Sequence, residues 1–228
     1  MIKRNLLEIE KNIQQACSRA NRNRDEVTLV VVTKNQPSTL ILETYDAGVR
    51  HFGENRAQEF MTKCDILPQD VTWHMIGHLQ RNKVKDIVGK VRLIHSVDSL
   101  RLAKAIEKEC LKRNLTADIL VEVNVAEEES KFGIRVDEVE LFVKQLSEFK
   151  YVQVKGLMTI APFVDNPETN REVFARLKKL SVDIEGQNID NVTMGVLSMG
   201  MTNDYHVAIE EGSTMIRVGT AVFGVRYS

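Results

Sequence analysis

A single lysine, Lys34, follows the first uniformly apolar run of the chain. The run 28–33 reads Thr-Leu-Val-Val-Val-Thr, which predicts a strand buried on both faces, as in a parallel sheet. Asn35, Gln36 and Pro37 end this strand. Partial desolvation at the carboxyl end of a core strand lowers the pKa of an amine and makes its nucleophilic form accessible. Lys34 is therefore a candidate Schiff-base lysine, and the alternative is a surface lysine in a strand-to-helix loop.

Two segments of small residues near the C-terminus could bind an anion. Segment 198–201 reads Ser-Met-Gly-Met and follows a predicted strand, and segment 219–220 reads Gly-Thr and follows the last predicted strand. Glycine lets backbone N–H groups face a concavity, and the two hydroxyls add donors. In α/β barrels the loops after the seventh and eighth strands commonly bind phosphate. We expect a phosphate site here, although each segment alone could be an ordinary turn.

Arg217 lies within the last predicted strand, two residues before Gly219. Side chains alternate along a strand, so this guanidinium can share the core face. A buried arginine is costly unless it is paired. A salt bridge to Glu122 or Glu54 therefore stays open beside a ligand-binding role.

The chain alternates predicted strands and helices from end to end. The strands are expected at 28–33, 49–52, 73–76, 93–97, 117–125, 152–160, 191–197 and 214–218, and the helices at 1–22, 38–48, 53–66, 82–90, 99–113, 136–147, 168–180 and 203–211. Strict alternation predicts a parallel sheet, and eight units in 228 residues predict a TIM-type (β/α)8 barrel. An open doubly wound sheet is the alternative, but no Gly-x-Gly-x-x-Gly follows the first strand.

We expect one domain over residues 1–228, with helix 1–22 covering the place beside the last strand. All strand carboxyl ends of a barrel open at one mouth. The polar residues at these ends should therefore share one cup, with Met158 beside it: Lys34, Asn55, His78, Asn124, Ser198, Arg217 and Thr220.

Composition excludes several classes of function. The net charge of −1 gives no field that would attract nucleic acid, and no apolar run approaches the roughly 18 residues of a membrane span. The N-terminus is not a secretory signal, because charges interrupt it every few residues. Three distant cysteines fit neither a disulfide framework nor a metal site, which favours a reducing cytoplasm. Four histidines share no ligand spacing and are interpreted as structural: His51, His74, His95 and His206. A role of His78 at the mouth stays open. No apolar stripe demands a partner, so we expect a monomer without metal.

Taken together, the motifs resemble the pyridoxal phosphate homeostasis proteins across nearly the whole chain. They occur in family order after Lys34: Phe52–Glu59, Trp73–Lys83, Val123–Val125 leading to Ser130–Gly133, Gly156–Pro162, Leu197–Met201 and Ile216–Gly224. The resemblance implies a fold similar to the N-terminal barrel of bacterial alanine racemase. It also implies that the chain binds pyridoxal 5′-phosphate (PLP).

The resemblance further implies a role for each site residue. Lys34 would carry PLP as a covalent internal aldimine, and Arg217 would face the pyridine nitrogen. Asn55 and Met158 would lie near the cofactor, and His78 receives no role. The phosphate would be held by Ser198, Gly219 and Thr220 with backbone from Met199 and Gly200.

By the same resemblance the protein would hold PLP reversibly, limit the free aldehyde, and pass PLP to PLP-dependent apo-enzymes. An arginine opposite the pyridine nitrogen favours the unprotonated ring, a poorer electron sink. Alanine racemase also needs a second base, which a second domain supplies. We do not expect such a domain in a chain that runs to Ser228. We therefore expect a carrier without robust catalysis. An amino-acid racemase or lyase using the same lysine, and a cofactor-free Schiff-base aldolase, are the alternatives.

Overall fold

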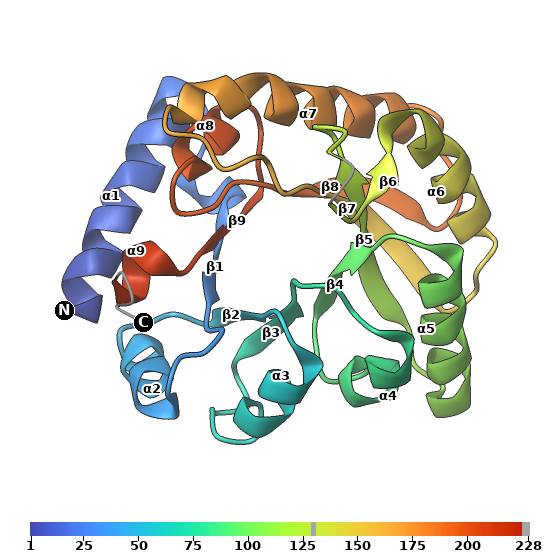
Figure 1. The fold of residues 1–228 in the computed structure, drawn as a ribbon, viewed down its shortest axis with the longest axis horizontal. Coiled ribbons are helices and arrows are strands. Elements are labelled where there is room, and N and C mark those ends of the chain that lie inside the picture. The colour runs from blue at the N-terminus through green and yellow to red at the C-terminus, as the bar shows by residue number, and fades with distance from the viewer. Residues whose placement is uncertain (129–130, 225–228) are drawn as a thin grey trace.

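Eight parallel strands close into a barrel in the computed structural model, which describes residues 1–128 and 131–224 (Figure 1). Around the ring each strand pairs with the next, and the pairings of β4 with β5 and of β9 with β1 complete the circle. The strands are β1 Thr28–Val32, β2 His51–Glu54, β3 Thr72–Met75, β4 Leu93–Val97, β5 Ala117–Asn124, β7 Val152–Met158, β8 Val192–Ser198 and β9 Met215–Val218. The predicted barrel is confirmed and the open sheet is excluded.

Helices ring the strands on the outside (Figure 1). They are α1 Ile2–Arg19, α2 Ser38–Asp46, α3 Ala57–Lys63, α4 Val84–Ile87, α5 Leu100–Arg113, α6 Val139–Ser147, α7 Arg171–Glu185, α8 Tyr205–Glu210 and α9 Thr220–Phe223. Short 3₁₀ turns occupy Arg24–Glu26, Arg81–Lys83, Val136–Glu138 and Pro167–Asn170. Among these described helices none is long and apolar enough to cross a membrane.

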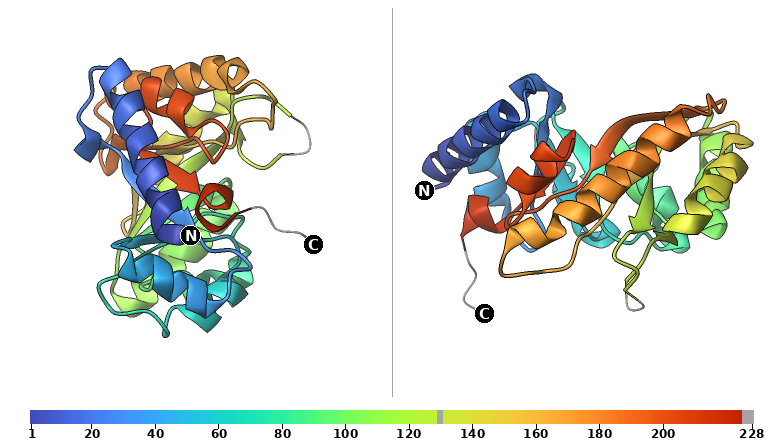
Figure 2. Two further views of the ribbon diagram at one scale, coloured as in Figure 1. Left: turned by 90° about the vertical axis from the view of Figure 1, so that its left-hand side faces the viewer. Right: turned by 90° about the horizontal axis from the view of Figure 1, so that it is seen from above.

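The N-terminal helix α1 packs against the last two helices, α8 and α9 (Figure 2). Asn5 Nδ2 donates to the backbone oxygen of Val222 at 2.9 Å, and Asn12 Nδ2 donates to the Tyr205 hydroxyl at 3.2 Å. One face of α1 is buried and includes Ile9. The helix thus lies against α8 and α9, the helices that precede and follow the last strand.

The predicted helix 53–66 begins too early. Gly53 and Glu54 are the last residues of β2, because they pair with His74 and Met75 of β3. Ladder hydrogen bonds thus outweigh the local turn propensity of glycine. Two further elements were not predicted: the two-residue strand β6, Ile134–Arg135, pairs with β5, and α9 follows the last strand.

The barrel interior holds its own apolar cluster, separate from the larger core between strands and helices. It is formed by Val30, Leu93, Leu120, Met158 and Met215. All five side chains are buried. The barrel is therefore filled rather than hollow, and its polar chemistry is confined to the mouth and to a few buried side chains.

Candidate functional site

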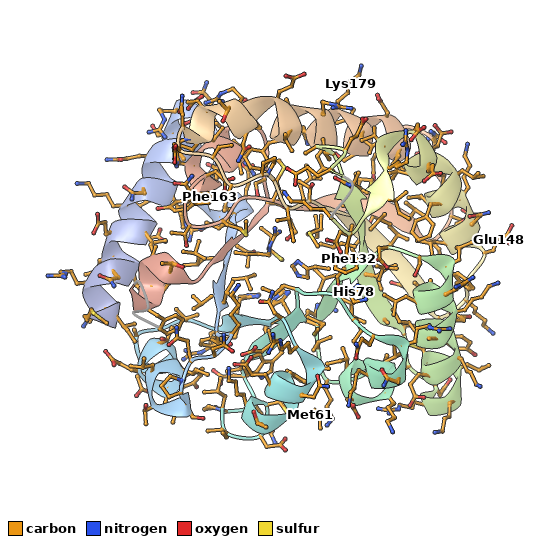
Figure 3. The ribbon with its side chains drawn as sticks, in the orientation of Figure 1. Met61, His78, Phe132, Glu148, Phe163 and Lys179 are labelled. Carbon is orange, nitrogen blue, oxygen red and sulfur yellow. The ribbon has the colours of Figure 1, made fainter. Side chains whose placement is uncertain are left out.

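A cavity of about 550 Å³ opens at the carboxyl ends of β1 and β9. That volume is typical of small-molecule sites. Its lining includes Lys34, Phe163, Met201, Arg217, Gly219 and Thr220. The loop residue Phe163 is 88% exposed and stands at the rim (Figure 3). An amine, a guanidinium and a glycine–hydroxyl pair thus share one cavity.

Lys34 lies two residues beyond β1 and is exposed rather than desolvated. The predicted partial burial is therefore wrong for this structure. The physical reason is that β1 ends at Val32, so the following turn carries the lysine past the barrel rim. Asn35 adopts a left-handed φ of 54° in that turn. The lysine still lines the cavity.

A buried ion cluster fixes the backbone on both sides of Lys34. Lys63 Nζ donates to the Thr33 carbonyl oxygen at 2.7 Å and lies 2.7 Å from Glu54 Oε1. Glu59 pairs with the same ammonium at 2.6 Å and accepts from the Asn35 backbone N–H. Burial raises the pKa of Glu54, although its hydrogen bond from Lys63 opposes the rise. These residues position Lys34 and were missed in the sequence, where only their closeness to the motif at 52–59 was a signal.

Arg217 is 4% exposed and sits beneath the cavity. Its Nη1 donates to Ser198 Oγ at 2.5 Å, and its Nη2 donates to the Thr159 carbonyl oxygen at 2.9 Å. Burial lowers its pKa to about 10, so the guanidinium remains charged at neutral pH. Two hydrogen bonds therefore hold the cation with one side toward the cavity.

The alternative of a salt bridge from Arg217 to Glu122 or Glu54 is not realised within 4 Å among the described residues, and Glu54 pairs with Lys63. Glu122 still acts on Arg217 through its charge, raising the pKa of the guanidinium. Burial raises the pKa of Glu122 to about 7; Asp98 adds to this rise and Arg217 opposes it. The partners of Arg217 are thus neutral oxygens.

Gly219 lies flush against β1. A Cβ at this position would stand 3.2 Å from the Val32 carbonyl oxygen and 3.3 Å from the Val32 side chain. Any larger residue would push into the strand that precedes Lys34. The glycine therefore keeps the Thr220 end of the cavity close to β1.

Ser198, Met199 and Gly200 do not line this cavity. Ser198 and Met199 are fully buried. A Cβ on Gly200 would stand 2.6 Å from Ala208 Cβ, so this backbone packs tightly on α8. The phosphate roles of these three residues stay predictions.

The predicted single cup is wrong in part. Asn55 and His78 line a neighbouring cavity of about 430 Å³, and the Asn124 amide is used to hold the Glu128 carbonyl oxygen at 2.8 Å. Met158 lies inside the barrel. The Asn55 Oδ1 atom is buried and has no hydrogen-bond partner in the described parts of the chain. A cofactor role for Asn55 or Met158 stays a prediction.

His78 stacks on Phe132, with ring centroids 4.2 Å apart and planes at 16° (Figure 3). Its Nδ1 lies 3.5 Å from Asp98 Oδ2. This ring therefore joins the loops that follow β3 and β5. Within residues 1–128 and 131–224 no three His, Cys, Asp or Glu side chains are arranged so that they could hold one metal ion.

The site has the donors that PLP requires. A lysine amine can reach an aldehyde, a buried guanidinium can face a ring nitrogen, and a glycine-bordered hydroxyl suits a phosphate. All three line one cavity of suitable size. The fold and these residues place the protein in a class: α/β barrels that carry a lysine and an arginine in one cavity at the carboxyl ends of their strands.

Comparison with known proteins narrows the class. Residues 5–227 match the family described as alanine racemase, N-terminal domain. The pyridoxal phosphate homeostasis protein of Aquifex aeolicus is 43% identical over 97% of this chain and 96% of its own length. The chain belongs to the pyridoxal phosphate homeostasis protein family, within the broader family of alanine racemase N-terminal domains.

Two solved structures share the fold closely. A protein of unknown function from Bifidobacterium adolescentis superposes with a TM-score of 0.93 at 34% identity, covering 97% of this chain and 94% of its own. PipY of Synechococcus elongatus, solved with PLP bound, gives a TM-score of 0.83 at 33% identity, covering 98% of this chain and all of PipY. A relative of similar length therefore binds PLP.

Proposed function

We propose that this protein binds PLP in the cavity between β1 and β9, as a Schiff base on Lys34, and takes part in intracellular vitamin B6 homeostasis. The observation that carries the proposal is that Lys34, Arg217, Gly219 and Thr220 line one cavity. The family and the PLP-bound relative PipY support the same ligand. Formation of the Schiff base joins Lys34 Nζ to the aldehyde carbon and releases one water.

The exposure of Lys34 suits a reversible carrier. An amine at an open mouth is accessible to the aldehyde from solvent, and a bound aldehyde there is accessible to water or to another amine. The ion cluster of Lys63, Glu54 and Glu59 holds the backbone beside it, so that the lysine side chain starts from a fixed point at the edge of the cavity.

Arg217 argues for holding rather than turnover. When bound, PLP supplies an electron sink through its pyridine ring. A guanidinium donates hydrogen bonds and keeps its protons, so it leaves a facing ring nitrogen unprotonated and weakens that sink. We propose a cytoplasmic monomer that delivers PLP to apo-enzymes, without robust catalysis of its own.

Borohydride reduction of the PLP-loaded protein, followed by peptide mapping, tests the assignment. The label is expected on Lys34 alone, and Lys34→Ala should take none. Lys83→Ala is a matched control, because this lysine lines the neighbouring cavity. Label on another lysine of the wild type, or no label, would overturn the assignment.

An assay with alanine and other amino acids separates the carrier from a racemase or lyase. Turnover at ordinary enzyme rates of about 1 per second or more would favour the enzyme. Transfer of PLP to an apo-enzyme at a rate above that of spontaneous release would support delivery.

A further inference from the structure

A row of hydrogen bonds runs through the barrel to Arg217. His51 Nδ1 lies 3.1 Å from His74 Nε2, and His74 Nδ1 lies 3.0 Å from His95 Nε2. His95 Nδ1 lies 2.9 Å from Ser198 Oγ, which accepts from Arg217 Nη1. His74, His95 and Ser198 are buried, and His51 is half-buried. We refer to His51, His74 and His95 as the histidine row.

The strand register produces this row. His51 pairs with Thr72, and His74 lies two residues further along β3. His74 pairs with Leu93, and His95 lies two residues further along β4. Side chains repeat every two residues, so all three rings share the inner face, and the barrel stagger makes them climb toward the carboxyl ends.

The donors and acceptors of the row can be arranged in only one direction without leaving a buried polar group unsatisfied. Arg217 is solely a donor, so the Ser198 oxygen accepts from it. The serine hydrogen then donates to His95 Nδ1, which places the His95 proton on Nε2. The same reasoning gives Nε2–H tautomers at His74 and His51. The reverse direction would leave the buried serine hydroxyl without an acceptor, at a cost of about 1–3 kcal/mol.

The charge of Arg217 favours the same direction. In the Nε2–H arrangement the serine oxygen and each Nδ1 lone pair face the guanidinium, so every dipole presents its negative end to the cation. Burial lowers the pKa of His74 to about 3. Burial, with the charges of His74 and Arg217, also lowers the pKa of His95 well below its usual range. These rings are therefore neutral at physiological pH.

The row spans the barrel from one mouth to the other. His51 lines a cavity of about 600 Å³ at the amino ends of the strands, whereas Arg217 lines the candidate PLP cavity. A proton cannot be relayed to that cavity, because the guanidinium at the end of the row keeps its protons. What such a row can do is hold the Arg217 guanidinium in one orientation.

We propose that His95, His74 and His51 are positioning residues for Arg217, forming a one-way row that fixes the guanidinium plane through Ser198. This inference rests on the proposed function in one respect: Arg217 faces the pyridine nitrogen of PLP. Loss of the His95 ring, which is nearest to Arg217, should therefore disturb the orientation of the guanidinium more than loss of the His51 ring at the far end of the row. Ser198 thereby gains an orienting role beneath the cavity.

Long-range ¹H–¹⁵N NMR of the imidazoles tests the row in the protein without PLP. All three rings are expected as neutral Nε2–H tautomers at neutral pH, and Ser198→Ala should change the signals of His95 first. A Nδ1–H tautomer or an imidazolium at His95 would overturn the inference. Because no PLP is present, this result stands even if the PLP assignment fails.

Variants then test the effect on the site, with PLP affinity and the absorbance spectrum of bound PLP as readouts. His95→Leu should weaken PLP binding about tenfold and shift the spectrum, and His51→Leu should do less of both. His206→Leu is the control, because this half-buried ring lies on α8 outside the row. If the loss of PLP affinity across the variants instead tracks their loss of melting temperature and not their distance from Arg217, the proposed positioning role is wrong. Wild-type protein that takes up no PLP would overturn the proposed function, and the NMR result would still decide the row.

Discussion

Lys63 Nζ lies 2.7 Å from the carbonyl oxygen of Thr33, the residue directly before Lys34. A buried ammonium on α3 thereby holds the end of β1. The same ammonium pairs with Glu54 at the end of β2. The lysine that we assign to PLP is thus exposed, while its backbone is fixed from below.

Lys63→Met should destabilise the fold by about 3–5 kcal/mol, because it leaves the buried Glu54 carboxylate without its partner. The double variant Glu54→Gln with Lys63→Met should recover most of this loss. Urea unfolding monitored by circular dichroism measures both. Lys155→Met is the control, since its ion pair with Asp118 is 3.7 Å long and partly exposed, and should cost less than about 1 kcal/mol. A double variant as unstable as the single one would contradict the pairing.

Lys34→Ala should abolish covalent PLP binding and change stability by less than about 0.5 kcal/mol, because an exposed side chain buries little surface. The absorbance spectrum after PLP addition and the melting temperature without PLP check the two parts. A large drop in melting temperature would show that this lysine has a structural role.

The buried histidines should make the fold sensitive to acid. Unfolded His74 takes up a proton below about pH 6.5, whereas the folded ring does so only near its pKa of about 3. Stability is therefore full above the unfolded pKa and falls as pH decreases between these values, by about 1.4 kcal/mol per pH unit for each such ring.

His74→Gln should reduce that slope, as measured by urea unfolding between the two pKa values. Glu122 acts in the opposite sense, because its raised pKa of about 7 adds stability as pH falls toward its unfolded value. This contribution is present in both proteins and cancels in the comparison. Equal slopes for wild type and variant would contradict a neutral buried His74.

Gly156→Ala should destabilise the barrel by about 3 kcal/mol or more. Its φ is 152°, and an added Cβ would stand 1.8 Å from the Val196 carbonyl oxygen. Gly195→Ala is the matched control, because a Cβ there meets nothing within 4 Å. Thermal unfolding should separate the two variants clearly. Similar melting temperatures would show that β7 and β8 can move apart to accept the methyl group.

Much of the site could be predicted from the sequence because strand ends are local features. The apolar run before Lys34 and the Gly219–Thr220 pair are recognisable from residue type alone, and both end at the cavity. Gly200 has the same residue type but does not line the cavity. Alternating elements fixed the barrel, and the barrel placed Lys34, Arg217 and Thr220 at one cavity, as expected. Asn55 was grouped with them because the sequence does not give the width of the mouth, and the structure places it in a neighbouring cavity.

The sequence by itself determined the order of strands and helices, the closed barrel and the chemical types at its mouth, because periodicity and composition act over short stretches of chain. Only the tertiary structure decided which distant side chains touch. The row of histidines depends on the stagger between three strands, and the exposure of Lys34 depends on where β1 stops pairing. Register is set by packing around the whole ring.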